Sequence, residues 1–297
     1  MPLIPMRELL QSARRSRYAV GYFESWDQYS FEAVLEAAEE SRSPVILGFG
    51  GVLMNRQWFD HGGLRGLTAM GRALAEGTKA PVAFLLNEVA TMTQIEQGLA
   101  WGFTAVMLDT SHLPLEENIA LTRQVAVAAH AQGVDVEGEL GELPDASGII
   151  GDPHASALTD PEQAARYVEE TGVDALSVAI GNVHILTDGQ ARIDLDHLAR
   201  LHERLNVPFV VHGGTGFPAA AIPRAIELGV AKFNVGTALK QCYFEGARDA
   251  LATVTGTPNV HELVGSRKAG DFLLRGKVRM REEVLRRMAQ YGCMGKG

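Results

Sequence analysis

Short apolar runs alternate with amphipathic stretches along almost the whole chain. The runs are rich in Val, Ile, Leu and Ala, and most are followed by residues with the three-to-four-residue spacing of a helix that buries one face. Eight runs are expected to be buried strands: residues 18–23, 44–47, 81–86, 105–109, 134–140, 175–180, 208–211 and 231–235. This alternation is typical of an α/β fold with a parallel sheet.

Helices are expected between these strands and after the last one. The predicted helices span residues 6–13, 31–43, 64–76, 93–102, 114–133, 160–172, 195–205, 219–228 and a segment from about 237. Asp160 is a good N-cap and Pro161 suits the first helical position, so the start of that helix is well marked. Beyond a Gly/Pro break at 256–258, the pattern predicts one or two more helices.

Eight β–α units with no break in composition predict one α/β domain over residues 1–297, a single (β/α)8 TIM barrel. The barrel is expected at about 17–253 and a C-terminal helical extension at about 257–292. A doubly wound open sheet is the alternative. Polar residues at most strand ends favour the barrel, because its strand ends converge on one mouth: Asn87, Glu88, Asp109, Glu139, His184, His212 and Asn234.

Composition narrows the class of partner. A net charge of −9 argues against nucleic-acid binding, and Arg14–Arg15 and Arg286–Arg287 are expected on solvated helix faces. No apolar run reaches the roughly 18 residues of a membrane span, and the N-terminus lacks the order of a signal peptide. A cytoplasmic protein without nucleic-acid or membrane partners is therefore expected.

Two histidines follow neighbouring predicted strands. His184 and His212 would be presented to the same mouth, where neutral imidazoles can bind Zn²⁺ or another divalent metal, with Glu88 as third ligand. Alternatively, one or both histidines bond a backbone carbonyl or the ligand without a metal. Glu88 could equally stand in the first turn of the next helix, where the helix dipole favours it.

Two glycine-containing segments, HGGTG (212–216) and NVGT (234–237), follow the last two predicted strands, the usual phosphate site of such barrels. Backbone amides, threonine hydroxyls and a helix N-terminus could hold a dianion there. The residues expected to do so are Gly213, Gly214, Thr215, Asn234, Gly236 and Thr237. Ordinary glycine turns with a capping threonine are the alternative.

Two further carboxylates, Asp109 and Glu139, end the fourth and fifth strands, and Glu137 shares a strand face with Glu139. Such a group could bind a cation or transfer protons. It could equally orient the histidines or bond loop amides.

Segments distributed over nearly the whole chain, among them YAVGYF, VMLDTSH, VDVEGELGEL, ALSVAIGNVH, VPFVVHGGTG and KFNVGTALK, resemble the class II, metal-dependent ketose-bisphosphate aldolases. The resemblance implies a TIM barrel, a zinc ion and a dihydroxyacetone-phosphate moiety held by the metal and the last two loops. It implies that His184 and His212 are two of three zinc ligands and that Gly181 belongs with the phosphate-binding residues. It further implies a second metal position at Asp109 and Glu139, and a homodimer or homotetramer.

The chain departs from that family after the third strand, where an Asp–His pair is replaced by Asn87–Glu88. In the family the aspartate exchanges a proton at the cleaved bond and the histidine binds zinc. Asparagine can hydrogen-bond but cannot exchange a proton, a loss typically worth roughly 10²–10⁴-fold in rate. Glu88 could replace the missing ligand, or it could be the displaced acid–base.

The leading hypothesis is a lyase that cleaves or forms a carbon–carbon bond in a phosphorylated ketose through a metal-stabilised enediolate. Its proposed catalytic residues are Asn87, Glu88 and Glu139, with Asp152 of the 141–159 loop a further candidate for proton transfer. Fructose 1,6-bisphosphate is not the expected substrate. The alternatives are a sugar-phosphate isomerase or epimerase that uses the same enediolate, and a non-catalytic subunit that binds a sugar phosphate.

Overall fold

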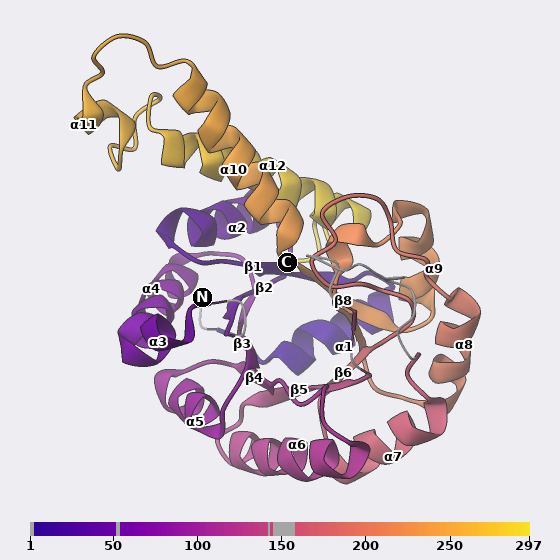
Figure 1. The fold of residues 1–297 in the computed structure, drawn as a ribbon. Helices are drawn as coiled ribbons and strands as arrows, with labels where there is room; N and C mark the ends of the chain where they lie inside the picture. Colours follow the sequence, from indigo (N-terminus) through magenta and orange to yellow (C-terminus); the bar gives the residue numbers. More distant parts are fainter. Residues whose placement is uncertain (1–2, 52–53, 142, 145–157) are drawn as a thin grey trace.

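Eight parallel strands close into a barrel in the computed structural model, which describes residues 3–51, 54–141, 143–144 and 158–297 (Figure 1). The strands are β1 (Val20–Glu24), β2 (Val45–Gly50), β3 (Val82–Val89), β4 (Ala105–Leu108), β5 (Asp135–Leu140), β6 (Ala175–Val178), β7 (Phe209–Val211) and β8 (Val230–Val235). They pair in chain order, and β8 pairs with β1, which places Tyr22 opposite Asn234. The predicted TIM barrel is confirmed, with each strand within a few residues of its expected place.

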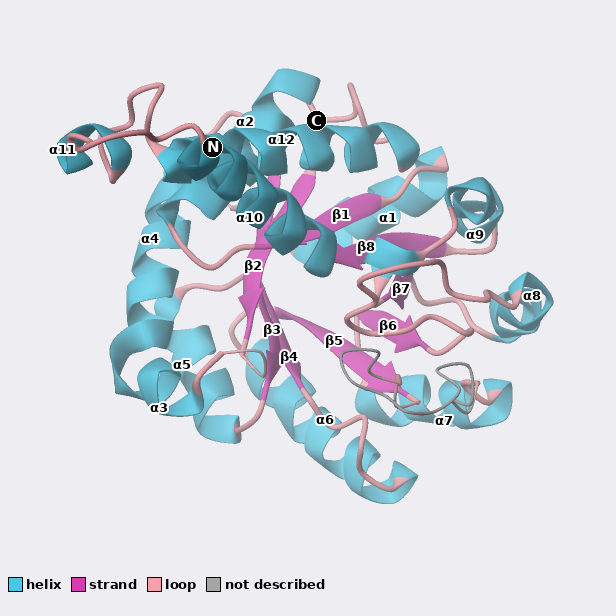
Figure 2. Ribbon diagram, turned by 45° about the horizontal axis from the view of Figure 1, so that its top comes forward, coloured by secondary structure: helices cyan, strands magenta, loops and turns pink. Residues whose placement is uncertain are grey.

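Helices surround the barrel in the order that the sequence pattern predicts (Figure 2). The α-helices are α1 (Met6–Ser16), α2 (Gln28–Ser41), α3 (Arg56–Trp58), α4 (Leu64–Gly77), α5 (Met92–Trp101), α6 (Leu115–His130), α7 (Pro161–Thr171), α8 (Leu195–Arg204), α9 (Ile222–Glu227), α10 (Thr237–Ala252), α11 (Val260–Leu263) and α12 (Phe272–Gln290). A π-helical turn spans Phe59–Gly63, and 3₁₀ turns span Gly214–Gly216 and Ala219–Ala221. Asp160 caps α7 as predicted, by accepting a hydrogen bond from the Gln163 amide.

The α1 helix closes the end of the barrel where the strands begin. The Ile4 amide donates to the carbonyl of Val82, the first residue of β3. The Arg7 amide donates to the side chain of Asp135, the first residue of β5. Met6 and Leu10 are buried beneath the strands. The carboxyl ends of the strands are left as the mouth, the end at which TIM barrels carry their active sites.

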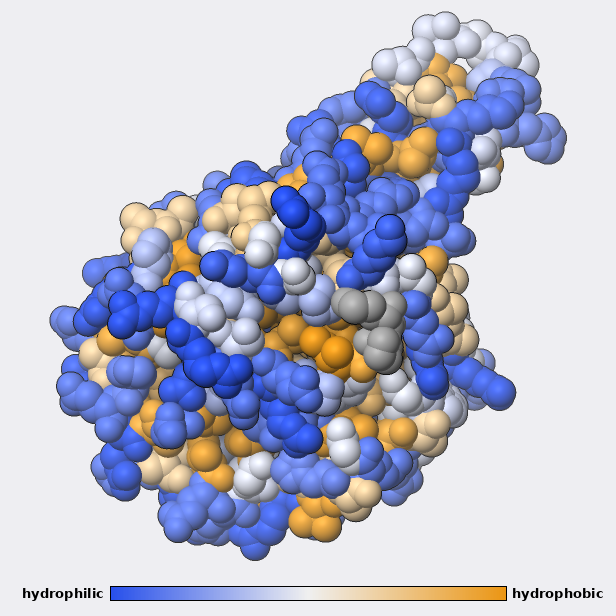
Figure 3. All heavy atoms as spheres, turned by 180° about the vertical axis from the view of Figure 1, so that it is seen from behind, coloured by the Kyte–Doolittle hydropathy of each residue, from blue (hydrophilic) through white to orange (hydrophobic). Residues whose placement is uncertain are grey.

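The C-terminal helices extend beyond the barrel. The helices α10 and α12 pack so closely that a Cβ on Gly246 would lie 2.7 Å from the Arg275 carbonyl oxygen, and one on Gly276 would lie 2.8 Å from that of Tyr243. Their outer parts, with α11, form an arm (residues 244–275) that projects from the barrel (Figure 1). In Figure 3, hydrophobic atoms lie along this arm between hydrophilic ones, and Phe244, Val260 and Val264 are more than half exposed.

Within the described residues, no helix is both long and apolar enough to pass through a membrane.

Candidate active site

One pocket opens at the barrel mouth, and residues from strands far apart in the sequence line it. Its lining residues are Tyr22, Glu24, Gly50, Asn87, Glu88, His184, Ile185, His212, Gly213, Thr215, Asn234, Val235, Gly236 and Thr237. Nine of these were predicted from the sequence as site residues: Asn87, Glu88, His184, His212, Gly213, Thr215, Asn234, Gly236 and Thr237. The fold therefore brings the predicted metal-binding and phosphate-binding residues into one pocket.

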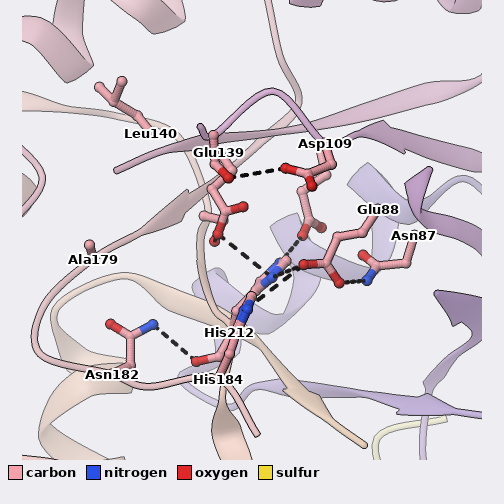
Figure 4. Close-up of polar contacts among 12 residues, drawn as sticks. Asn87, Glu88, Asp109, Glu139, Leu140, Ala179, Asn182, His184 and His212 are labelled. Atoms are coloured by element: carbon pink, nitrogen blue, oxygen red, sulfur yellow. Dashed lines mark hydrogen bonds and ion pairs between the residues drawn. The ribbon is translucent and has the colours of Figure 1, made fainter. Parts of the chain in front are cut away.

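Glu88, His184 and His212 converge at this mouth (Figure 4). Each offers one ligating atom, and these atoms lie within 4.8 Å of one another. Glu88 Oε1 is 3.3 Å from His212 Nδ1 and 3.9 Å from His184 Nε2. The two imidazole rings are nearly parallel, with centroids 5.6 Å apart. Two imidazoles and a carboxylate at this spacing are a donor set that suits zinc and leaves coordination positions for a substrate.

An irregularity in β3 directs Glu88 into the cluster. The pairing of β3 with β4 shifts register between Leu86 and Val89, and Glu88 has φ of 46°, in the left-handed region that non-glycine residues seldom adopt. Glu88 thus lies in the strand, and α5 begins only at Met92, so the alternative of a first-turn helix residue is wrong. Strain of this kind persists where surrounding structure enforces it, commonly at functional sites.

The side chain of Asn87 is hydrogen-bonded to that of the next residue, Glu88. Its Nδ2 donates a hydrogen bond to Glu88 Oε2, because a carboxylate can only accept. The amide oxygen Oδ1 is buried and has no hydrogen-bond partner among the described residues. Asn87 therefore orients the Glu88 carboxylate and offers the pocket an acceptor rather than a donor.

His212 is held from below by a buried ion pair. Its Nε2 lies 2.8 Å from Glu137 Oε1, and Lys232 Nζ lies 2.7 Å from Glu137 Oε2; both Glu137 and Lys232 are fully buried. A carboxylate partner keeps a proton on Nε2, so in the neutral imidazole, the form that binds a metal, the lone pair is on Nδ1, the nitrogen that faces Glu88. The Asn182 side chain also donates to the His212 carbonyl at 3.0 Å, which anchors the main chain.

The electrostatics of the cluster favour a cation. Burial opposes ionisation of Glu88, yet the charges of His212 and His184 hold its pKa down to about 2. Burial by itself would lower the pKa of His212, but Glu139 and Glu88 raise it to about 10. Burial raises the pKa of Glu139 to about 7, although His212 opposes that rise. The carboxylates of Glu88 and Glu139 thus stabilise positive charge at His212, where a bound divalent cation would take the place of the proton.

The two predicted phosphate loops are joined to each other. Thr215 Oγ1 accepts a hydrogen bond from the Ala238 amide in the first turn of α10, at 3.2 Å. Gly213 has φ of 68°, and a Cβ there would lie 2.1 Å from the Val183 carbonyl oxygen, so only glycine fits. The N-terminus of α10, with Gly236 and Thr237, lines the same side of the pocket.

Arg287 braces one of these loops from α12. It is buried, and its guanidinium donates to the carbonyl oxygens of Gly214 at 2.9 Å and Thr215 at 3.3 Å. The expectation that the Arg286–Arg287 pair lies on a solvated helix face is therefore wrong for Arg287. Its charge satisfies loop carbonyls and Glu283 instead of water.

Four predicted site residues lie outside the pocket lining. Gly181 has φ of 95° and packs against the Arg192 carbonyl, while the Gly214 carbonyl faces Arg287. Glu139 Oε1 accepts from Ser177 Oγ and lies 3.7 Å from His212 Nδ1, behind the metal group. Asp109 bonds Ser111 and is not part of the three-residue group. Asp152 falls outside the described residues.

Sequence reasoning missed three inward-facing residues: Tyr22, Glu24 and Lys232. Tyr22 and Glu24 line the pocket, and Lys232 lies beneath it. The sequence contains a signal for these residues, because side chains two positions apart on a strand point to the same face. Lys232 therefore shares a face with Asn234, and Glu137 shares one with Glu139. Applied to every strand, that alternation would have found the residues below the mouth as well as those at it.

Several polar atoms of this pocket lack protein partners. The hydroxyl of Tyr22, Oδ1 of Asn87, Nδ1 of His212 and both amide atoms of Asn234 are buried and make no hydrogen bond within the described part of the chain. Buried polar groups are almost always satisfied, so this concentration in one pocket indicates a ligand. The His212 nitrogen suits a metal, and the oxygens and amide suit hydroxyl groups.

Comparison with known proteins gives a consistent result. A family model described as fructose-bisphosphate aldolase class-II matches residues 4–296. A fructose-bisphosphate aldolase of Geobacillus stearothermophilus is 34% identical over 302 residues, covering 100% of this chain and 99% of that protein. A 6-phospho-5-dehydro-2-deoxy-D-gluconate aldolase of Halalkalibacterium halodurans is 35% identical, covering 95% of this chain and 100% of that protein. The crystal structure of the YdjI aldolase from Escherichia coli K12 superposes with a TM-score of 0.82 at 29% identity and covers 99% of each chain.

Proposed function

Because the chain belongs to the class II fructose-bisphosphate aldolase family and is an enzyme of the lyase type, we propose that this pocket is its active site. The enzyme is a metal-dependent aldolase that acts on a phosphorylated ketose. The observation that carries the assignment is the convergence of Glu88, His184 and His212 beside the two phosphate loops.

The metal would be held by His212 Nδ1, His184 Nε2 and Glu88 Oε1. The uncommitted Nδ1 of buried His212 supports this set, and so does its mixture of imidazole and carboxylate donors, which suits Zn²⁺. When bound, a divalent cation supplies a Lewis acid that polarises a carbonyl or hydroxyl oxygen. Asp109 and Glu139 remain the candidates for a second cation position.

Glu88 acts as a ligand in this proposal. Its Oε1 is the atom turned to both histidines, while Oε2 is occupied by Asn87. A carboxylate with both oxygens engaged is poorly placed to exchange a proton with substrate. The ligand role therefore fits the geometry better than the acid–base role.

Proton transfer then falls to another group, and Glu139 is the described candidate. Its Oε1 lies 3.7 Å from His212 Nδ1, and burial raises the pKa of its carboxyl, which favours a group able to hold a proton. Asn87 would accept a hydrogen bond from a substrate hydroxyl through its free Oδ1. Asp152, in the 141–159 loop, remains an alternative proton donor.

The phosphate of the substrate would bind where HGGTG and NVGT meet. Gly213, Thr215, Gly236 and Thr237 line that side of the pocket, and the α10 N-terminus favours an anion. With Asn87–Glu88 in place of the family's Asp–His pair, the expected substrate differs from fructose 1,6-bisphosphate. Cleavage of fructose 1,6-bisphosphate at rates typical of the family would contradict that expectation.

We further propose that the protein is a cytoplasmic homodimer or homotetramer. The exposed apolar side chains Phe244, Val260 and Val264 on the arm favour association, because hydrophobic surface of this kind is costly in water. Light scattering on a size-exclusion column tests it. A monomer at micromolar concentration would contradict it.

Aldol addition tests the function directly. The zinc-loaded enzyme, incubated with dihydroxyacetone phosphate and a panel of hydroxyaldehydes, is expected to form a new ketose phosphate that phosphorus NMR detects. Exchange of sugar-phosphate protons with solvent without carbon–carbon bond formation would favour an isomerase or epimerase. Binding without any turnover would favour a non-catalytic subunit.

A further inference from the structure

The metal-binding and phosphate-binding roles leave Tyr22 of β1 unused. Its side chain is only 3% exposed and lines the pocket, on a strand that pairs with β2 on one side and β8 on the other. The hydroxyl is buried and has no hydrogen-bond partner among the described residues. A buried hydroxyl left unsatisfied costs free energy, so this one points to a contact with the molecule that the pocket binds.

The ring of Tyr22 is held in place by its neighbours. Lys232 Nζ lies 5.0 Å from the ring centroid, a distance at which an ammonium group is attracted to an aromatic face. A Cβ on Gly48 of β2 would stand 3.1 Å from Cε2 of the ring, so the ring packs closely against that strand. The hydroxyl is therefore carried into the pocket by a ring with little freedom to move. A hydrogen-bond donor fixed in this way needs no reorganisation during a reaction.

Lys232 also links Tyr22 to the metal group. Its Nζ lies 2.7 Å from Glu137 Oε2, and Glu137 Oε1 lies 2.8 Å from His212 Nε2. The Tyr22 ring and the His212 imidazole thus rest on the same buried ion pair, and both line the pocket above it. This chain of contacts places Tyr22 beside the metal group.

The phenol of Tyr22 is a donor that keeps its proton. Burial raises its pKa well above the usual value for tyrosine, and the charges of Glu24, Glu88 and Glu137 raise it further. At neutral pH the phenol is therefore uncharged and can donate a hydrogen bond to an oxygen. Because Glu24 and Glu88 line the same pocket, Tyr22 supplies a neutral donor among carboxylates.

Aldol chemistry requires such a donor. When the carbon–carbon bond forms, the π electrons of the aldehyde carbonyl move to its oxygen, which becomes an alkoxide. In cleavage, the same oxygen loses its proton before the bond breaks. Asn87 offers only an acceptor, since its Nδ2 is bonded to Glu88. A ketose hydroxyl both donates and accepts, so it can donate to Asn87 Oδ1 and accept from Tyr22.

We propose that Tyr22 is a catalytic residue, which donates a hydrogen bond to the substrate oxygen that becomes an alkoxide when the carbon–carbon bond forms or breaks. The inference rests on the proposed function and deepens it. The metal and the phosphate loops hold the dihydroxyacetone-phosphate half of the substrate, and Tyr22 acts on the aldehyde half. Tyr22 stabilises charge there, while the proton is exchanged with another group, for which Glu139 remains the candidate.

Two reactions of the zinc-loaded enzyme separate these halves. Exchange of a dihydroxyacetone phosphate proton with D₂O needs no aldehyde, whereas addition to glycolaldehyde or glyceraldehyde creates the alkoxide. In Tyr22→Phe, the rate of addition should fall about 10²–10³-fold, the usual cost of removing one fixed donor from such an oxygen. The rate of proton exchange should be nearly unchanged. Phosphorus NMR measures the addition, and proton NMR measures the exchange.

Tyr243→Phe is the matched control. The Tyr243 hydroxyl is also buried without a partner among the described residues, but Tyr243 lies on α10 outside the pocket lining. Both reactions should proceed in this variant as in the wild type.

The stability of Tyr22→Phe tests whether the hydroxyl serves the fold instead. Phenylalanine keeps the ring over Lys232 and removes only an unsatisfied hydroxyl. The midpoint of urea unfolding without substrate should therefore stay the same or rise. A lower midpoint would show that the hydroxyl bonds within the protein, and would overturn the inference.

The outcomes separate this inference from the proposed function. An unchanged rate of addition in Tyr22→Phe would overturn the role of Tyr22. An equal fall in addition and exchange would also overturn it, because Tyr22 would then act on the triose half or on the whole site. A wild type that catalyses neither reaction would contradict the proposed function, and this inference with it.

Discussion

Glu137 Oε1 lies 2.8 Å from His212 Nε2, so the nitrogen of His212 that faces the pocket is Nδ1. Glu137 is in turn paired with Lys232, and neither side chain is accessible to solvent. The chain from Lys232 through Glu137 to His212 links the barrel interior to the proposed metal site. Partners of this kind orient a ligand and raise its basicity.

The double variant Glu137→Gln/Lys232→Met tests that orientation. An amide can present either its oxygen or its nitrogen to Nε2, so the proton on His212 is no longer fixed, and metal affinity should fall about 10–100-fold. Competition with a chromophoric chelator measures the affinity. Metal binding as tight as in the wild type would show that Glu137 does not orient His212.

The single variant Lys232→Met separates folding from metal binding. It leaves the Glu137 carboxylate buried without its cation, which should cost about 3–5 kcal/mol of unfolding free energy, whereas the double variant should recover much of this loss. Urea unfolding of the metal-free proteins measures both. A double variant less stable than the single one would contradict the account of a buried ion pair.

Glu88→Gln distinguishes the two roles considered for Glu88. If the carboxylate is a metal ligand, metal affinity should fall at least about tenfold, because a neutral amide is a weaker ligand for zinc. If it is the acid–base instead, the metal should remain bound while turnover falls roughly 10²–10⁴-fold. The metal content after dialysis, measured together with the turnover rate, distinguishes the two roles. We expect loss of metal.

Gly213→Ala should destabilise the phosphate loop by more than the cost of placing an alanine at positive φ. A methyl group there would meet the Val183 carbonyl, and φ is 68°. Gly189→Ala is the matched control, because φ is 81° but nothing lies within 4 Å of an added Cβ. The control should lose about 1–2 kcal/mol of stability, and Gly213→Ala should lose more and bind phosphate ligands more weakly. Equal losses in urea unfolding would contradict the close approach.

Asp135 should make stability depend on pH. Burial, with repulsion from Asp174, raises its pKa to about 6, although the Arg7 amide donates to it. A carboxyl whose folded pKa exceeds its unfolded value stabilises at low pH, and that contribution is lost as pH rises through about 6. Between about pH 5 and pH 8, wild type should therefore lose about 1 kcal/mol relative to Asp135→Asn. Parallel pH profiles of the two proteins would contradict this.

The barrel could be predicted from the sequence because each strand carries its own local signal. Strands such as residues 81–86 and 175–180 are short apolar runs followed by helical spacing, and the register of a closed barrel leaves few alternatives. The expected convergence of His184, His212 and Glu88 followed from topology alone, because the carboxyl ends of the strands meet at one mouth.

Other features of the site could not be predicted, because they depend on contacts between distant segments that no local sequence pattern encodes. The left-handed backbone at Glu88 arises from a register shift between β3 and β4, which propensity does not reveal. The burial of Arg287 depends on how α12 packs near the loop at Gly214, a contact between segments 73 residues apart. Glu24 ends β1, the first strand, yet it lies against Gly236, the residue that follows β8, because β1 pairs with β8 to close the barrel.

Proton exchange tests the proposed metal-dependent aldolase site at Glu88, His184 and His212, and it requires no knowledge of the aldehyde. In D₂O, the zinc-loaded enzyme should replace a proton on the hydroxyl-bearing carbon of dihydroxyacetone phosphate with deuterium, as proton NMR would show. The exchange should stop when a chelator removes the metal, return when zinc is restored, and be absent in His212→Ala. Exchange at an undiminished rate in the chelated enzyme or in His212→Ala, or no exchange by the zinc-loaded wild type, would contradict a metal-dependent aldolase site at these residues.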